Sequence, residues 1–164
     1  MISQADRRYG TKARNRLVDA SDPTADGARA ALESFYYALN QRDITVLGSV
    51  WSEHPLAQLN NPLGGILRGG SAIIALYRRI FDGSARLQVE LADIVEYVGK
   101  DHVVFAGRET GTYAVADDTP VPLSIRTTRY FRYDEGISRW TQFHHHGSID
   151  DAEALRAYQQ TVGR

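Results

Sequence analysis

The sequence predicts an α+β domain in which helices come first and a long antiparallel sheet follows. Apolar residues recur at helical spacing from residue 28 to residue 82. From residue 86 onward the spacing changes to the alternation that is typical of strands. The strands are joined by short connections, which favour an antiparallel meander. A run of helices followed by a run of strands indicates the α+β class.

The first two helices have recognisable starts. Asp22 can accept hydrogen bonds from free backbone amides, and Pro23 suits the first position of a helix. Asp43 can cap a second, short helix in the same way. We expect that helix to end at His54-Pro55, because the residue before proline avoids helical geometry.

The rest of the chain is predicted from caps and turn signals. Residues 56–60 can form a short strand, and Ser71 can cap a third helix. Gly83 follows that helix, and glycine suits the left-handed position after a helix. A terminal helix is expected over residues 150–162. Turn signals separate four long strands, at residues 86–98, 102–115, 121–133 and 137–148.

We predict one domain, because the sequence shows no internal repeat and no linker. Residues 1–22 form a polar, basic N-terminal arm, interpreted as a solvated arm or short helix, or as a segment that packs on a partner subunit. Residues 23–150 form the domain, and residues 151–164 form a C-terminal tail that can be helical. A long twisted sheet can curl around the helices into a cone, which leaves a pocket at the open end.

Composition excludes several classes of protein. The chain has 164 residues, 43% of them hydrophobic, which is typical of a globular protein. A net charge of -1 gives no overall attraction to nucleic acid. Cysteine is absent, so disulfides and thiolate metal sites are excluded. No stretch approaches membrane-spanning length, and we expect a cytoplasmic protein without nucleic-acid or membrane partners.

The last strand, Trp140 to Ser148, contains three consecutive histidines in an alternating apolar pattern. Successive side chains of a strand point to opposite faces. His145 therefore points one way, while His144 and His146 point the other. His144 and His146 share a face, but the strand offers no third ligand and no carboxylate, so no metal site is predicted.

Several segments resemble the nuclear transport factor 2-like superfamily. They run from Phe35 to Asp43, through Val50-Trp51 and Asn61 to Gly65, and along the closing strand. Within the superfamily the chain is most similar to SnoaL-like domains and to the association domain of calcium/calmodulin-dependent protein kinase II, over about residues 25–148. The resemblance implies a strongly curved antiparallel sheet wrapped as a cone-shaped barrel around three N-terminal helices, with an internal pocket, and a homodimer. This fold hosts isomerases, hydrolases, cyclases, binding modules and assembly domains.

Ketosteroid isomerases are enzymes of this fold, and the chain departs from their pattern. Their proton-abstracting Asp precedes a proline, where this chain has Asn61. Their oxyanion-hole tyrosine on the first helix corresponds to Phe35. An amide cannot take a proton at neutral pH and a phenyl ring cannot donate a hydrogen bond, so the resemblance argues against steroid isomerisation.

In kinase association domains, arginines project into the cavity from neighbouring strands. Arg108 and Arg129 resemble two of those positions, and Gly147 stands at a third. The alternatives are an internal ion pair of Arg108 with Asp93 or Glu109, and exposure of Arg129 on its strand. The resemblance also implies a cavity face on the closing strand that is shared by Thr141, Phe143, His145 and Gly147.

Three hypotheses on function follow. In the first, the pocket binds a small, carboxylate-like organic anion through Arg108, Arg129 and His145. In the second, a cofactor-independent isomerase, cyclase, dehydratase or hydrolase uses His145 as general acid or base. In the third, the domain is an oligomerisation or scaffold module. Neither a cofactor nor a metal is expected. The further candidates for the pocket, of which the aromatic ones can instead be core residues, are Asn61, Tyr37, Trp51 and Tyr77.

Overall fold

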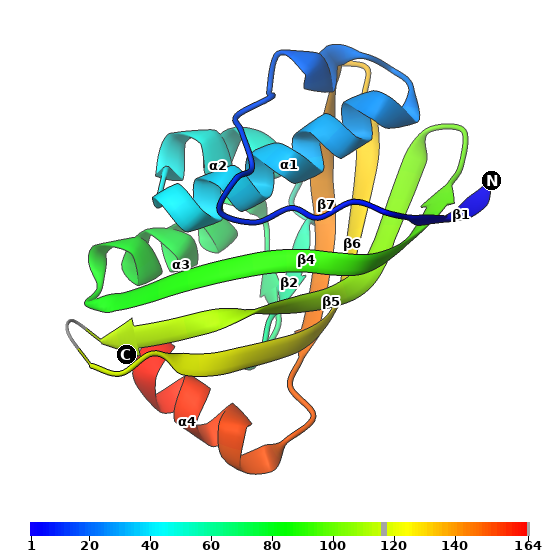
Figure 1. Ribbon diagram of the computed structural model, residues 1–164. Helices are drawn as coiled ribbons and strands as arrows, with labels where there is room; N and C mark the ends of the chain where they lie inside the picture. The colour runs from blue at the N-terminus through cyan, green and yellow to red at the C-terminus, as the bar shows by residue number, and fades with distance from the viewer. Residues whose placement is uncertain (116–117, 164) are drawn as a thin grey trace.

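The computed structural model describes residues 1–115 and 118–163, and its centre is a strongly curved sheet that wraps around helices (Figure 1). The sheet has seven strands in the order β1-β4-β5-β6-β7-β2-β3. The strands are β1 (Ile2–Ala5), β2 (Gln58–Asn60), β3 (Leu67–Arg68), β4 (Ala85–Val98), β5 (His102–Val115), β6 (Val121–Asp134) and β7 (Arg139–Ser148). The helices are α1 (Ala25–Gln41), α2 (Ile44–Val50), α3 (Gly70–Asp82) and α4 (Ala152–Val162), with a short 3-10 turn η1 (Asp19–Ser21).

The four long strands confirm the predicted meander. Strands β4 to β7 pair consecutively and antiparallel, with bounds close to those predicted. The short strand β2 is also present, and it runs parallel to β7, with Leu59 opposite His145. The cone-shaped α+β architecture predicted from the sequence is therefore the one observed.

The sheet bends where the regular pairing of β4 and β5 is interrupted. The register shifts between Ala92 and Val95, and Asp93 takes a positive φ of 52°. Such a bulge increases the local twist. On the facing strand, a Cβ at Gly107 would lie 2.7 Å from the carbonyl oxygen of Ala92. Glycine is therefore required at this close approach, which lets the sheet curl around α1.

The N-terminal arm is part of the sheet, so the expectation of a solvated arm or short helix is wrong, while packing on a partner subunit stays a prediction. Strand β1 pairs antiparallel with β4, and Tyr9 forms a further bridge with Leu91 (Figure 1). The first residues satisfy backbone groups along the edge of β4 that would otherwise be unpaired.

The structure confirms the predicted cap of α2 and corrects its end and the cap of α1. The carboxylate of Asp43 accepts from the amides of Thr45 and Val46, as expected, but α2 ends at Val50, before the predicted proline stop. The cap of α1 is Thr24, because Asp22 instead accepts from the amide of Thr24.

Helix α3 begins two residues earlier than predicted and ends as predicted. Its N-cap is Gly69 (φ 84°) rather than Ser71, so no side chain caps its first turn. Gly83 does follow the helix, yet its φ of -70° and ψ of 172° are extended rather than left-handed.

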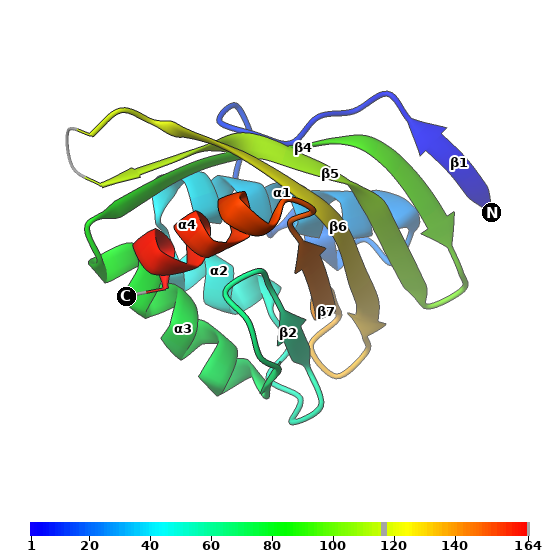
Figure 2. The same ribbon diagram turned by 90° about the horizontal axis from the view of Figure 1, so that it is seen from below.

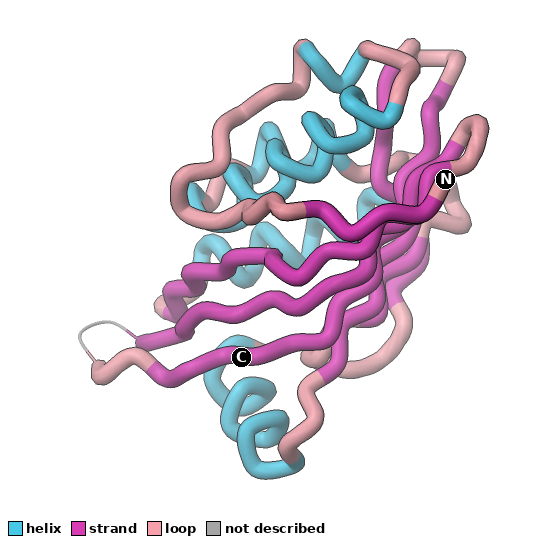
Figure 3. Tube along the Cα trace, turned by 45° about the vertical axis from the view of Figure 1, so that its right-hand side comes forward, coloured by secondary structure: helices cyan, strands magenta, loops and turns pink. Residues whose placement is uncertain are grey.

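The C-terminal helix α4 lies across the end of the cone, between the sheet and the loop that follows β2 (Figures 2 and 3). Tyr158 is buried there and meets Tyr113 of β5 edge to face. The side-chain amide of Gln159 donates to the carbonyl of Pro62, at 2.9 Å. The predicted terminal helix therefore closes the open end of the cone. None of the helices in the described residues is long and apolar enough to cross a membrane.

Candidate functional site

A buried ion pair lies between α1 and the concave face of the sheet. Arg129 of β6 donates from Nη2 to Oε1 of Glu109 on β5, at 2.7 Å. Nε of Arg129 donates to the hydroxyl of Tyr36 (2.9 Å), and that hydroxyl donates to the same oxygen of Glu109 (2.6 Å). The guanidinium lies 3.7 Å from the centroid of the Phe35 ring. Side chains from two strands and one helix thus meet in a closed network.

The charge states in this network follow from burial and from the neighbouring groups. Burial alone would lower the pKa of Arg129, but Tyr36 and Glu109 raise it above its ordinary value, so the guanidinium stays charged. Burial raises the pKa of Tyr36 well above its ordinary value. Burial likewise raises the pKa of Tyr77 to about 12, partly offset by Arg129. Both phenols are therefore neutral hydrogen-bonding groups at neutral pH.

His145 pairs with Arg129 across β6 and β7 and faces the same interior. Only 4% of the residue is exposed, and neither ring nitrogen has a hydrogen-bond partner among the described residues. Burial, and then the charge of Arg129, lower the pKa of His145 well below its ordinary value. The ring is therefore a neutral imidazole with one free donor and one free acceptor.

Two more polar groups beside His145 lack partners. Gln142 accepts from Nη1 of Arg129 through Oε1 (3.1 Å), while its Nε2 has no partner in the described part of the chain. The hydroxyl of Thr127 is also unpaired, and Thr127 lies opposite Gly147. A Cβ at Gly147 would lie 3.2 Å from Nε2 of His145, so the imidazole leans along β7 toward Gly147, the strand neighbour of Thr127. We call His145, Gln142 and Thr127 the interior polar cluster.

Strand β7 contains a bulge, and for that reason its cavity face differs from the one predicted. The register with β6 shifts so that His144 pairs with Tyr130 and Gln142 pairs with Phe131, which leaves Phe143 as the extra residue. Gln142 therefore shares the inner face with His145 and Gly147. Thr141 and Phe143, which were predicted there, line an outer groove instead. Simple alternation fails here because one inserted residue reverses the faces of all residues before it.

Arg108 is not brought to the interior, so both interpretations of it are wrong. Its side chain is exposed and donates to the hydroxyl of Ser124, at 3.0 Å. The next residue, Glu109, is the buried one and is the partner of Arg129. A signal was present in the sequence, because Val103, Phe105 and Glu109 share one strand parity.

The other predicted pocket residues do not lie together in the structure. Tyr77 lies in the interior, where the positive charge of Arg129 partly offsets the rise in the pKa of its hydroxyl. Asn61 accepts from the amide of Leu63 (3.1 Å) and so shapes its own loop. Tyr37 is half-buried at the margin of the core, and Trp51 lines the outer groove.

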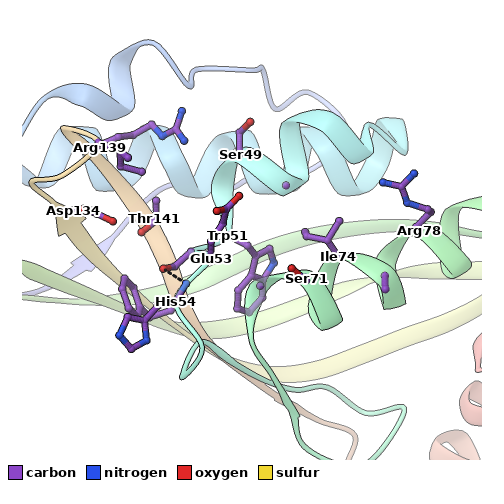
Figure 4. A pocket seen from close by; sticks show the side chains of 16 residues that line it. Ser49, Trp51, Glu53, His54, Ser71, Ile74, Arg78, Asp134, Arg139 and Thr141 are labelled. Atoms are coloured by element: carbon purple, nitrogen blue, oxygen red, sulfur yellow. Dashed lines mark hydrogen bonds between the residues drawn. The ribbon is translucent and has the colours of Figure 1, made fainter.

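The outer groove lies between the end of α2, the first turns of α3 and the β6–β7 hairpin (Figure 4). Its volume is about 860 Å³. Trp51, Ile74 and Phe143 contribute apolar surface, while Arg78 and Arg139 contribute charge. Within the described residues, no group of His, Asp and Glu side chains is arranged to hold a metal ion.

Comparison with known proteins places the chain in a family. The model of the SnoaL-like domain matches residues 28–152, which is most of the chain. The chain belongs to the SnoaL-like domain family. No curated protein matches it.

Solved structures similar to this SnoaL-like domain share its fold. A protein from Thiobacillus denitrificans, named for a calcium/calmodulin-dependent protein kinase type II association domain, is 27% identical (TM-score 0.59; 75% of this chain and 94% of that chain covered). A nuclear transport factor 2-like superfamily protein from Salmonella enterica is 17% identical (TM-score 0.66; 77% and 92% covered). A ketosteroid isomerase-like protein from Erwinia carotovora is 15% identical (TM-score 0.62; 84% and 98% covered).

Proposed function

We propose that this SnoaL-like domain binds a small, uncharged organic molecule inside the cone, through the interior polar cluster. The observation that carries the proposal is the unpaired imidazole of His145, together with the unpaired Gln142 amide and Thr127 hydroxyl. Leaving a buried polar group without a partner costs about 1–3 kcal/mol. A ligand that supplies partners for several such groups would recover that free energy.

The chemistry of the cluster favours a molecule with hydroxyl and carbonyl groups. The unpaired atoms include donors on Gln142 and one donor and one acceptor on neutral His145. The anion expected from the sequence is less well supported here. Glu109 already balances the charge of Arg129, and Arg108 lies outside the cone.

Entry to the cluster requires movement of α4. The unpaired atoms of the cluster are shielded from solvent, and Tyr158 of α4 is buried near Glu109 and Tyr77 in the same interior. Helix α4 is held chiefly by side chains such as Tyr158 and Gln159. A helix held by few contacts opens more easily than the core of the sheet.

A probe titration tests the proposal. Hydroxyacetone and 2-hydroxycyclohexanone would be titrated into the protein while the histidine ring resonances are followed by NMR. We expect shifts at His145 that are lost in His145→Ala and kept in His146→Ala, since His146 is exposed on the same strand. Absence of any shift, in both the wild type and a Tyr158→Ala variant with a widened end, would refute the proposal.

A second candidate function is catalysis at the same place. The neutral imidazole of His145 has one ring nitrogen that is free to take a proton, and Gln142 and Thr127 can orient a substrate beside it. Turnover of a bound hydroxyketone, lost in His145→Ala with binding otherwise retained in His145→Gln, would support an enzyme. Binding without turnover would leave the binding function alone.

Homodimer formation, a cytoplasmic location and a scaffold role stay predictions. Light scattering on the purified protein measures the oligomeric state directly.

A further inference from the structure

The outer groove differs from the interior polar cluster in position and in chemistry. The groove opens to solvent beside α2, the start of α3 and the β6–β7 hairpin (Figure 4). The cluster is buried and lies on the other face of β7. Neighbouring residues of β7 line the two places, Thr141 the groove and Gln142 the cluster, and the bulge at Phe143 puts Gln142 on the same face as His145.

The groove wall contains buried hydrogen-bond donors without partners. They are the indole Nε1 of Trp51, Nε of Arg139 and the hydroxyl of Thr141. Trp51 is 2% exposed and Thr141 is 1% exposed, so neither residue is served by bulk water. Indole and guanidinium nitrogens can only donate. The missing partner is therefore an acceptor.

Positive charge is available at the same place. Neither Arg78 nor Arg139 forms an ion pair among the residues that the structure describes. Gly70 and Ser71, in the first turn of α3, also line the groove, and Gly69 offers no side chain to cap that turn. The first amides of a helix are free donors that favour negative charge.

The remaining wall limits what the anion can be. Ile74, Ile137 and the rings of Trp51 and Phe143 supply apolar surface. Glu53 and Asp134 also lie along the groove, and their carboxylates oppose a second negative charge on the ligand (Figure 4). A volume of about 860 Å³ suits a small organic molecule.

From these observations we propose that the outer groove binds an organic monocarboxylate with an apolar body. The carboxylate accepts from Arg139, Thr141 and the indole of Trp51, and the body packs against Ile74 and the aromatic rings. This site is independent of the interior polar cluster, and its ligand is of a different class.

Three matched probes test the site by isothermal titration calorimetry. They are 3-phenylpropionate, its neutral amide 3-phenylpropionamide, and the dianion phenylsuccinate. We expect 3-phenylpropionate to bind about tenfold or more tightly than either relative, because one charged hydrogen bond is worth about that factor. Binding should also change the fluorescence of Trp51.

Variants locate the site. Arg139→Gln and Thr141→Val should each weaken binding of 3-phenylpropionate about tenfold. Arg126→Gln, the same change at an exposed arginine that pairs with Asp150 on the outer sheet face, should leave binding unchanged. His145→Ala should also leave it unchanged, which separates this result from the test of the interior polar cluster.

Four outcomes of the titrations would overturn the proposal. These are no binding of 3-phenylpropionate at millimolar concentration, equal binding of the amide, equal binding of the dianion, or unchanged binding in both Arg139→Gln and Thr141→Val. Trp51 fluorescence that depends on protein concentration without any probe would also overturn it, because a second copy of the chain would then cover the groove.

Discussion

The substitution Glu109→Gln tests whether the negative charge of Glu109 stabilises the buried, positively charged Arg129. The substitution keeps an oxygen that can accept from Arg129 and from Tyr36, both now bonded to Oε1 of Glu109. It removes the negative charge while the guanidinium stays fully buried against Phe35. Breaking a buried pair in this way costs about 3–5 kcal/mol. We expect about 3 kcal/mol, at the low end, since the acceptor oxygen remains.

A double-mutant cycle separates the charge effect from a general loss of packing. Arg129→Met alone should cost about 3 kcal/mol, because it leaves the carboxylate of Glu109 buried without its partner. The double variant should cost about 3 kcal/mol or less, rather than about 6, because no buried charge remains in it. The coupling between the two sites is then about 3 kcal/mol.

Urea denaturation followed by circular dichroism measures all four proteins, with the free energy of unfolding taken by linear extrapolation. A domain of this size has about 5–15 kcal/mol in total, so the single variants should remain folded at low temperature. Additive costs in the double variant, or a cost below about 1 kcal/mol for Glu109→Gln, would refute the reasoning.

Two further predictions concern pH and the C-terminal helix. The pKa of His145 is depressed in the folded protein, so below the ordinary value of about 6.5 the unfolded chain binds a proton that the folded one does not. The free energy of unfolding should therefore fall by about 1.4 kcal/mol more between pH 7.5 and pH 5.5 in the wild type than in His145→Gln. Urea titrations at both pH values measure this, and His146→Gln should behave as the wild type; equal slopes in all three would contradict the burial of a neutral imidazole. Tyr158→Ala should lower the free energy of unfolding by about 3 kcal/mol through loss of a buried ring, whereas exposed Gln160→Ala on the same helix should change it little. Similar effects of these two helix variants in urea denaturation would show that α4 does not close the cone.

The fold could be predicted because its signals are local. Alternation of side chains marked the four long strands, and Asp43 was a correct cap because its carboxylate needs only amides two and three residues away. The predicted caps of α1 and α3 each lie two residues from the observed ones, Thr24 and Gly69. The N-terminal strand was missed because its partner, β4, lies far along the chain.

The candidate site was predicted only in part, because strand parity indicates which residues are buried but not which of them pair. His145, Arg129 and Tyr77 do lie in the interior. Glu109 was considered as a partner for the wrong arginine, although the parity of Val103 and Phe105 places it inside.

By itself, the sequence determined which strands form, which way most of them face, and that a buried histidine would stand in the closing strand. These properties depend on the period of apolar residues and on strand parity, which are local. Tertiary structure alone decided that a bulge puts Gln142, and not Thr141, on the face of His145, that Glu109 balances Arg129, and that α4 closes the cone. Each depends on register or contact between segments distant in the chain, which no local pattern encodes.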